Sequence, residues 1–270
     1  MKYIDTHCHV FPDQIAKHAI GTLSQKSEYV AVADGTLADT IKTQQEWGCH
    51  QFVMLDIATS AKSVPKVNDF LIEHNDNKRI FSFGTIHPDF QDYVAELDRL
   101  ENAGIKGIKF HPGYQNFLMD EKRMYPIYEE VAKHNMILLF HAGYDPAFDG
   151  SDCSDPFRAA NILRDLKGAK IILAHMGNYL NNHEAMKHLM GSDTYFDVSV
   201  ASVYMAKQEM EQMIKAHGVE KFLYATDCPW SSGIKTQEVI NSLNLPDGDK
   251  EKIFYKNAAK LLQIEERDVE

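Results

Sequence analysis

The chain has 270 residues, a hydrophobic fraction of 44% and a formal net charge of −11. The acidic charge argues against a nucleic-acid partner, because proteins that grip phosphate backbones usually carry a basic stripe. Four widely spaced cysteines without a Cys-x-x-Cys pair, no apolar run long enough to span a bilayer and no apolar signal core favour a cytoplasmic protein without a disulfide framework or a membrane partner.

Residues 3–6 are predicted to form a strand that leads into the motif Asp5-Thr6-His7-Cys8-His9. Side chains two positions apart on a strand point the same way, so His7 and His9 should aim at one point. Two neutral imidazoles on a rigid strand end provide half of the ligands that a cation such as Zn²⁺ needs. Residues 10–34 follow, with an amphipathic part at 14–23, and are expected to form a lid or pocket wall beside this pair.

Helical and apolar segments alternate through the rest of the chain. Strands are predicted at 51–56, 79–84, 105–110, 136–140, 170–174, 194–198 and 221–226, and helices at 36–48, 60–74, 89–102 (capped by Asp89), 121–134, 156–166, 183–190 and 203–217. With the first strand this makes eight units of about 30 residues, the number at which a parallel sheet can close. The expected fold is an α/β single domain over residues 1–270, a (β/α)₈ TIM barrel.

Residues that can bind metals or move protons follow several of these strands. They are His7 and His9, Lys109 and His111, His141, His175, and Asp227. Active sites of this barrel lie at the carboxyl ends of the strands. One strand-end histidine could be a hydrogen-bonded core group. Five of the chain's 13 histidines at such positions, together with an aspartate, indicate a functional site instead.

These positions resemble the amidohydrolase superfamily, and most of all its amidohydrolase-2 branch of metal-dependent TIM-barrel hydrolases and decarboxylases. The motifs that carry the resemblance are Asp5-Thr-His-Cys-His9, Gly107-Ile-Lys-Phe-His-Pro112, His141-Ala-Gly143, Leu173-Ala-His-Met-Gly177, Thr226-Asp-Cys-Pro229 and the terminal segment 252–262. The resemblance implies that His7, His9, His141 and Asp227 surround one divalent metal. It also implies that His175 is a neighbouring acid/base or substrate-polarising group.

The chemistry of these residues is compatible with that arrangement. Neutral imidazoles leave most of the charge of Zn²⁺ uncompensated, which acidifies a bound water molecule. Asp227 would accept the proton, and His175 would stabilise charge on a carbonyl oxygen. Lys109 and His111 are expected to bind a substrate carboxylate. A carboxylated Lys109, Mn²⁺ in place of Zn²⁺ and a second metal that uses His175 remain open alternatives.

The leading functional hypothesis is metal-dependent hydrolysis of a C–N or C–O bond, in an amide or lactone, by metal-activated water. The alternative is non-oxidative decarboxylation of an aromatic or unsaturated carboxylic acid in the same site. A TatD-like nuclease is less favoured because the chain is acidic and has Lys109 where that group has a ligating glutamate. A small-molecule substrate is expected, its identity determined by loops 10–34, 112–120 and 142–154. A homo-oligomer is left open.

Overall fold

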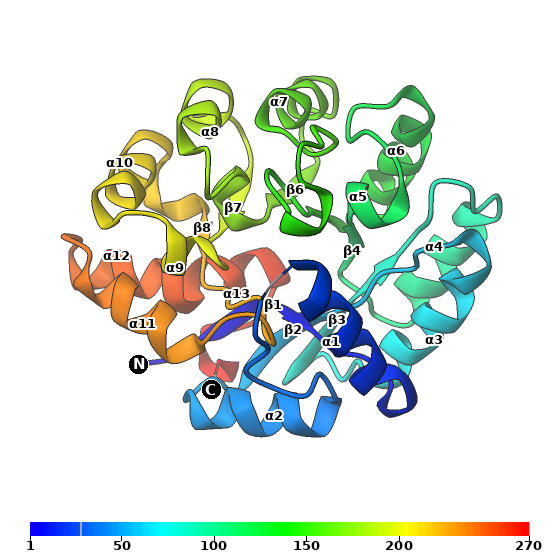
Figure 1. The fold of residues 1–270 in the computed structure, drawn as a ribbon, viewed down its shortest axis with the longest axis horizontal. Helices are drawn as coiled ribbons and strands as arrows, with labels where there is room; N and C mark the ends of the chain where they lie inside the picture. The colour runs from blue at the N-terminus through cyan, green and yellow to red at the C-terminus, as the bar shows by residue number, and fades with distance from the viewer. Residues whose placement is uncertain (28, 270) are drawn as a thin grey trace.

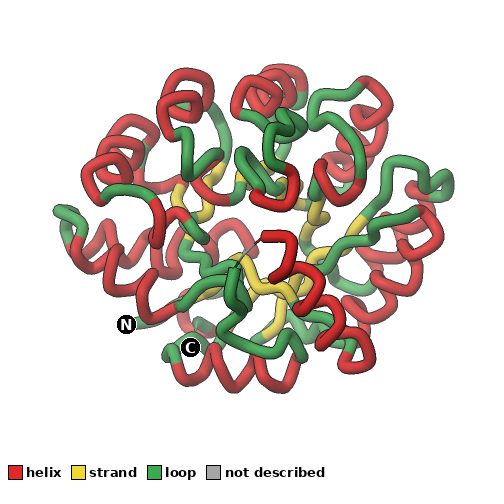
Figure 2. Tube along the Cα trace, in the orientation of Figure 1, coloured by secondary structure: helices red, strands yellow, loops and turns green. Residues whose placement is uncertain are grey.

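The structure, a computed structural model, describes residues 1–27 and 29–269. Its centre is an eight-stranded sheet in which every neighbouring pair runs parallel and the strands follow one another in chain order. The strands are β1 (Ile4–His9), β2 (Gln51–Leu55), β3 (Ile80–Thr85), β4 (Gly107–Phe110), β5 (Ile137–Phe140), β6 (Lys170–Leu173), β7 (Tyr195–Asp197) and β8 (Phe222–Leu223). Figures 1 and 2 show them surrounded by helices.

The sheet closes where the first and last strands meet. The backbone N–H of Thr6 donates to the carbonyl of Tyr224 at 3.0 Å, and that of His9 donates to the carbonyl of Cys228 at 2.6 Å. Cys8 and Cys228 form a parallel bridge between these bonds. The predicted single-domain TIM barrel is therefore confirmed.

Helices cover the outside of the barrel. They are α1 (Asp13–Ser27), α2 (Leu37–Glu46), α3 (Val64–Glu73), α4 (Tyr93–Asn102), α5 (Pro112–Gln115), α6 (Tyr125–Lys133), α7 (Pro156–Asp165), α8 (Asn182–Leu189), α9 (Ala201–Tyr204), α10 (Lys207–His217), α11 (Gly233–Ser242), α12 (Asp247–Glu251) and α13 (Asn257–Leu262). Short 3₁₀ turns lie at Ala61–Ser63, Lys122–Met124, Pro146–Phe148, His175–Gly177, Val219–Lys221 and Glu266–Asp268, and a π-helical turn at Lys252–Lys256. Within the described residues, no helix is both long and apolar enough to cross a membrane.

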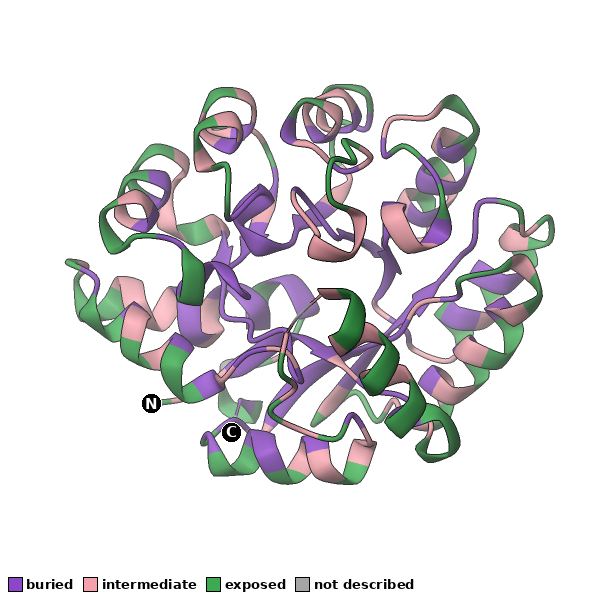
Figure 3. Ribbon diagram, in the orientation of Figure 1, coloured by how far each residue is buried: buried purple, intermediate pink, exposed green. Residues whose placement is uncertain are grey.

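Alternate residues of each strand face two different cores. On β5, Leu138 and Phe140 pack outward against the helices, whereas Ile137 and Leu139 belong to the cluster inside the barrel. Leu261 of α13 packs on the inner cluster as well. Figure 3 shows the strands buried and α1 largely exposed in front of them. The strands therefore form a rigid base, and α1 lies at the edge of it.

Two helix predictions are wrong in detail. The helix predicted at 89–102 begins only at Tyr93, because residues 87–90 form a turn in which Phe90 N–H donates to the carbonyl of His87. The helix predicted at 203–217 is two helices, α9 and α10, separated at Met205 and Ala206, where the backbone is extended. Helix α11 was not among the predicted elements.

Candidate active site

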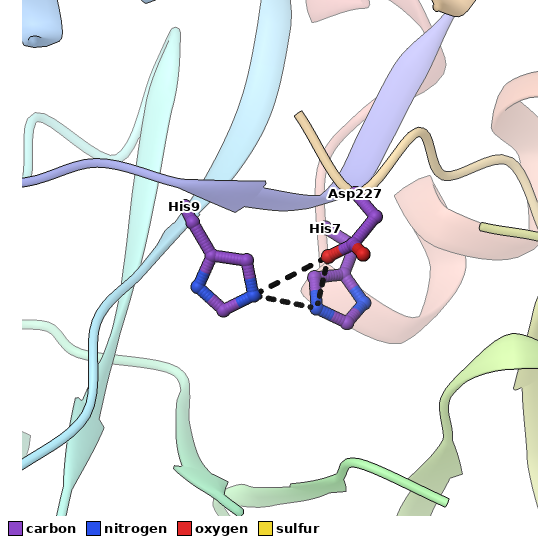
Figure 4. Close-up of side chains that lie close together, drawn as sticks. All are labelled: His7, His9 and Asp227. Carbon is purple, nitrogen blue, oxygen red and sulfur yellow. Dashed lines mark hydrogen bonds and ion pairs between the residues drawn. The ribbon is translucent and has the colours of Figure 1, made fainter. Parts of the chain in front are cut away.

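Three potential metal ligands converge where the first and last strands meet (Figure 4). His7 Nε2 and His9 Nε2 lie 3.2 Å apart, and each lies 3.3 Å from Oδ1 of Asp227. Burial lowers the pKa of His7 to about 4 and lowers that of His9, so both rings are neutral and have lone pairs to share. One nitrogen of each ring and one carboxylate oxygen thus surround a single point, as a divalent cation requires.

The orientation of His7 is fixed by Asp197, at the end of β7. His7 Nδ1–H donates to Asp197 Oδ2 at 2.8 Å, and both side chains are fully buried. The proton on Nδ1 leaves the Nε2 lone pair facing His9 and Asp227. A carboxylate behind a histidine is the usual way in which metal-binding rings are oriented. We therefore include Asp197 in the site, although the sequence did not single it out.

Asp197 also organises the turn after β6. Its Oδ1 accepts from the backbone N–H groups of His175 at 3.0 Å and of Ser199 at 3.1 Å, and from the Ser199 hydroxyl. Burial opposes its ionisation, but the contacts with His7, His175 and Ser199 hold the pKa of Asp197 below its ordinary value. One carboxylate therefore links β1, β6 and β7.

A hydrogen-bond chain continues from Ser199 to His141. The Ser199 hydroxyl donates to Asp197, so its oxygen is free to accept from His175 Nδ1–H at 2.8 Å. His175 Nε2 then accepts from His141 Nδ1–H at 3.1 Å. This leaves His141 Nε2 as a buried acceptor with no hydrogen-bond partner among the described residues. A buried, unpaired imidazole nitrogen is what a metal-binding histidine presents before its cation arrives.

Lys109 lies beneath the cluster, inside the barrel. It pairs in register with Leu139, is fully buried, and places Nζ 3.1 Å from His7 Nε2. Burial lowers the pKa of Lys109 to about 8. His111, in contrast, lines the cavity above the cluster, and its Nε2 lies 3.2 Å from Asp145 Oδ2. Direct substrate contact is thus easier for His111 than for Lys109, and both roles stay predictions.

A cavity of about 720 Å³ opens above these residues. His9, His111, His141, His175 and Asp227 contribute to its lining. The rest is largely aromatic and aliphatic: Phe11, Ile15, Leu23, Tyr29, Ile57, Val67, Tyr114, Tyr144, Phe148, Tyr179 and Trp230. Helix α1 supplies part of this wall, which confirms the role expected for residues 10–34. The site can therefore enclose a small, mostly apolar molecule that has a polar end.

Residues 4–264 match the family Amidohydro_2, amidohydrolase. The chain belongs to the amidohydrolase family. Of the solved structures, a dihydroxybenzoic acid decarboxylase from Polaromonas sp. JS666 with bound manganese and an inhibitor, 2-nitroresorcinol, is similar at a TM-score of 0.74 and 15% identity, over 99% of this chain and 98% of that chain. No curated protein matches the sequence.

Two further structures extend this comparison within the amidohydrolase fold. A 2,6-dihydroxybenzoate decarboxylase from Rhizobium has a TM-score of 0.73 at 16% identity, over 98% of this chain and 99% of that chain. A probable 2-pyrone-4,6-dicarboxylic acid hydrolase from Acinetobacter baumannii, with citric acid bound, has a TM-score of 0.66 at 16% identity, over 97% of this chain and 100% of that chain. At these identities the likeness supports the shared barrel alone.

The four ligands implied by the amidohydrolase resemblance are only partly assembled. His7, His9 and Asp227 form one cluster, whereas His141 groups with His111 and Asp145. The His111 and His141 rings are stacked, with centroids 4.2 Å apart and planes 16° from parallel. Nearly parallel stacked rings direct their lone pairs side by side, so this second group is poorly shaped for a tetrahedral ion. The role of His141 as the fourth ligand therefore stays a prediction.

Three residues around the cavity have left-handed backbone conformations that are uncommon outside glycine. The φ angles are 57° at His175, 58° at Val200 and 62° at Asp227. Such conformations persist only where surrounding contacts enforce them, and they cluster at functional sites. At His175 the enforcing contact is the bond from its N–H to Asp197. The chain turns sharply there, so the imidazole faces the cavity.

Proposed function

We propose that this amidohydrolase is a metal-dependent, non-oxidative decarboxylase of a small aromatic carboxylic acid. The observation that carries the proposal is a cavity walled by aromatic rings directly above a cluster of two imidazoles and a carboxylate. An aromatic ring fits the wall, and an acid group at one end of that ring would reach the cluster. The decarboxylases of dihydroxybenzoic acids among the similar structures support the same substrate class.

The metal would be held by His7, His9 and Asp227, with His141 as the proposed fourth ligand. Imidazole and carboxylate donors suit both Zn²⁺ and Mn²⁺, and manganese is bound in one of the similar decarboxylases. When bound, the cation supplies positive charge that anchors the carboxylate of the substrate. The unpaired His141 Nε2 and the neutral His7 ring supply the donor chemistry that such an ion needs.

The chain's own residues perform the remaining steps. Burial opposes the ionisation of Asp227, but contacts with His7 and His9 hold its pKa below the ordinary value, so this carboxylate must first take up a proton from solvent in the cavity. Asp227 then passes that proton to the ring carbon that bears the carboxylate, after which the C–C bond breaks, CO₂ leaves and the ring recovers its electrons. His175 lines the cavity with its Nδ1 proton held by Ser199 and with Nε2 accepting from His141 Nδ1–H. It would act on a substrate oxygen through Nε2, once that atom has released His141 and taken up a proton. His111 and the aromatic wall orient the ring. The net reaction consumes one proton for each CO₂ released.

Hydrolysis of an amide or lactone is the second candidate. The same imidazole and carboxylate donors are suited to a metal that activates water, and one similar structure is a probable lactone-dicarboxylate hydrolase. Decarboxylation ranks first because the wall of the cavity is mainly apolar, whereas hydrolysis must admit water to the reacting bond.

An activity screen with two readouts tests the assignment. Protein loaded with Mn²⁺ or with Zn²⁺ is incubated with hydroxybenzoates, lactones and amides, and CO₂ release is measured beside acid release. We expect the wild type to release CO₂ from at least one aromatic acid. If His7→Ala no longer releases CO₂ from that acid, the activity belongs to this site. Acid release without CO₂ would establish the hydrolase instead.

A further inference from the structure

Besides Asp145 and Asp227, a third carboxyl group, that of Asp56, lines the cavity. Asp56 directly follows β2 and is only 6% exposed, yet it forms part of the cavity wall. The preceding residue, Leu55, pairs in register with His9. Asp56 thus lies on the strand next to β1, one residue past the position that pairs with the ligand His9. None of the steps described above uses this side chain.

The hydrogen bonds around Asp56 are incomplete for a buried carboxylate. Its Oδ1 accepts from the N–H of Ile57 at 2.7 Å, which is the one bond found for this side chain within residues 1–27 and 29–269. In that part of the chain, no Lys, Arg or His nitrogen lies within ion-pair distance of it. Burial accordingly raises the pKa of Asp56 to about 7. Buried carboxyl groups normally have more partners than this.

The surroundings of Asp56 suggest what supplies the missing partner. The segment that follows Asp56 and the start of α3 contribute Ile57, Thr59, Ser63 and Val67 to the cavity wall, so this part of the wall is apolar with hydroxyl groups and no charge. The cations of this cavity wall, such as Lys26 on α1, make no ion pair with it. A ligand that fits here presents a hydrocarbon surface with one hydrogen-bond donor, as the edge of a hydroxylated or aminated ring does. An anionic group is disfavoured, because it would face a carboxylate.

We propose that Asp56 binds a hydroxyl or amino substituent on the aromatic ring of the substrate and accepts its proton during the reaction. This inference rests on the proposed decarboxylation. As the ring carbon that bears the carboxylate gains a proton, the ring loses electron density, and the substituent replaces it by giving its O–H or N–H proton to Asp56. When the C–C bond breaks, CO₂ leaves with no charge, the ring becomes aromatic again, and Asp56 returns the proton to the substituent. No other reactant is needed.

Calorimetry with matched ligand pairs tests the contact without requiring turnover. The probes are the 2-, 3- and 4-hydroxybenzoates, each compared with its methoxybenzoate, on Mn²⁺-loaded wild-type protein and on Asp56→Asn. Hydrogen bonds to charged groups are strong enough for a preference of about tenfold or more. We expect at least one hydroxy isomer to show that preference in the wild type, and we expect Asp56→Asn to bind both members of that pair about equally.

The matched control is Asp149→Asn, which makes the same chemical change at an exposed position outside the cavity wall and should keep the preference. The proposal is overturned if the wild-type protein binds both members of every hydroxy and methoxy pair equally. This test needs no variant, so it holds even if Asp56→Asn folds poorly. A preference that survives in Asp56→Asn overturns it too. A preference that depends on Asp56 in a protein that releases no CO₂ supports the contact and refutes the decarboxylase assignment.

Discussion

Replacing Asp197 by asparagine should weaken metal binding without removing any ligand. In the structure, one carboxylate oxygen accepts from His7 Nδ1–H, while the other accepts the N–H groups of His175 and Ser199 and the Ser199 hydroxyl. Asparagine has one oxygen for these two sets of donors. If the asparagine oxygen keeps its hydrogen bonds from the His175 N–H, the Ser199 N–H and the Ser199 hydroxyl, the asparagine NH₂ group faces His7 Nδ1–H. Two hydrogen-bond donors would then point at each other.

The ring can escape that clash only by moving its proton to Nε2, the atom that must bind the cation. Loss of such an outer partner typically weakens metal affinity by about 10–100-fold, which corresponds to about 1.4–2.7 kcal/mol. We expect the upper part of this range, because His7 and Asp197 are both fully buried and no water can replace the lost acceptor. His9 and Asp227 remain as ligands, so the variant should still bind the cation, but more weakly.

Chelator competition with Zn²⁺ and with Mn²⁺ measures the effect as a ratio of dissociation constants. The control is Asp193→Asn. Asp193 lies in the segment that leads into β7, and its exposed carboxylate pairs with Lys221. The metal affinity of this variant should match that of the wild type. Thermal unfolding of the metal-free proteins checks that Asp197→Asn still folds. A folded Asp197→Asn protein with wild-type affinity for both ions would refute the reasoning about the His7 tautomer.

Three further substitutions separate the roles proposed for other groups. Asp227→Asn should keep one oxygen near the ion but lose about 10²–10⁴ in kcat because proton transfer fails; a near-normal kcat at full metal content would remove Asp227 from the chemistry. His175→Asn should keep metal content and lose about 10²–10³ in kcat, whereas a halved two-metal stoichiometry, measured by elemental analysis, would show a binuclear site. The third is Asp56→Asn, which should change how stability depends on pH. Because the pKa of Asp56 rises from 3.8 to about 7 on folding, the wild type loses stability as pH rises between these values. The variant lacks this loss, so relative to the wild type it should gain up to about 4 kcal/mol between pH 4 and pH 8. Urea unfolding at both pH values measures this gain, and equal differences at the two would contradict it.

Strand positions were predictable because buried parallel strands are short apolar runs, and those runs are well separated in this chain. Helix boundaries were less so. Asp89 looks like a cap, but the local turn between His87 and Phe90 delays the helix to Tyr93. The sequence also could not show that residues 203–217 break at Met205, since no proline or glycine marks the break.

The expectation that active-site residues follow the strands identified most of the site, and the residues that it missed share a common cause. Asp56 and Asp197 lie within the predicted strands 51–56 and 194–198, and nothing in their sequence neighbours distinguishes them from ordinary surface carboxylates. Their significance depends on residues far away in the chain: Asp197 accepts a hydrogen bond from His7, and Asp56 is buried without a charged partner among the described residues. The directions of His175 and Asp227 likewise depend on left-handed φ angles that their residue types do not predict.

The cluster of His7, His9 and Asp227 brings together residues from opposite ends of the chain. Two donors leave the ribosome first, but the third belongs to the segment after β8, so more than 200 residues must be made between them. The nascent chain can therefore hold an ion only weakly until its last strand is in place. Once it is, the ion ties β1 to β8 across the gap that only a few backbone bonds close. Metal supply would then act on the final stage of biosynthesis as well as on activity, because the ion stabilises only the finished ring.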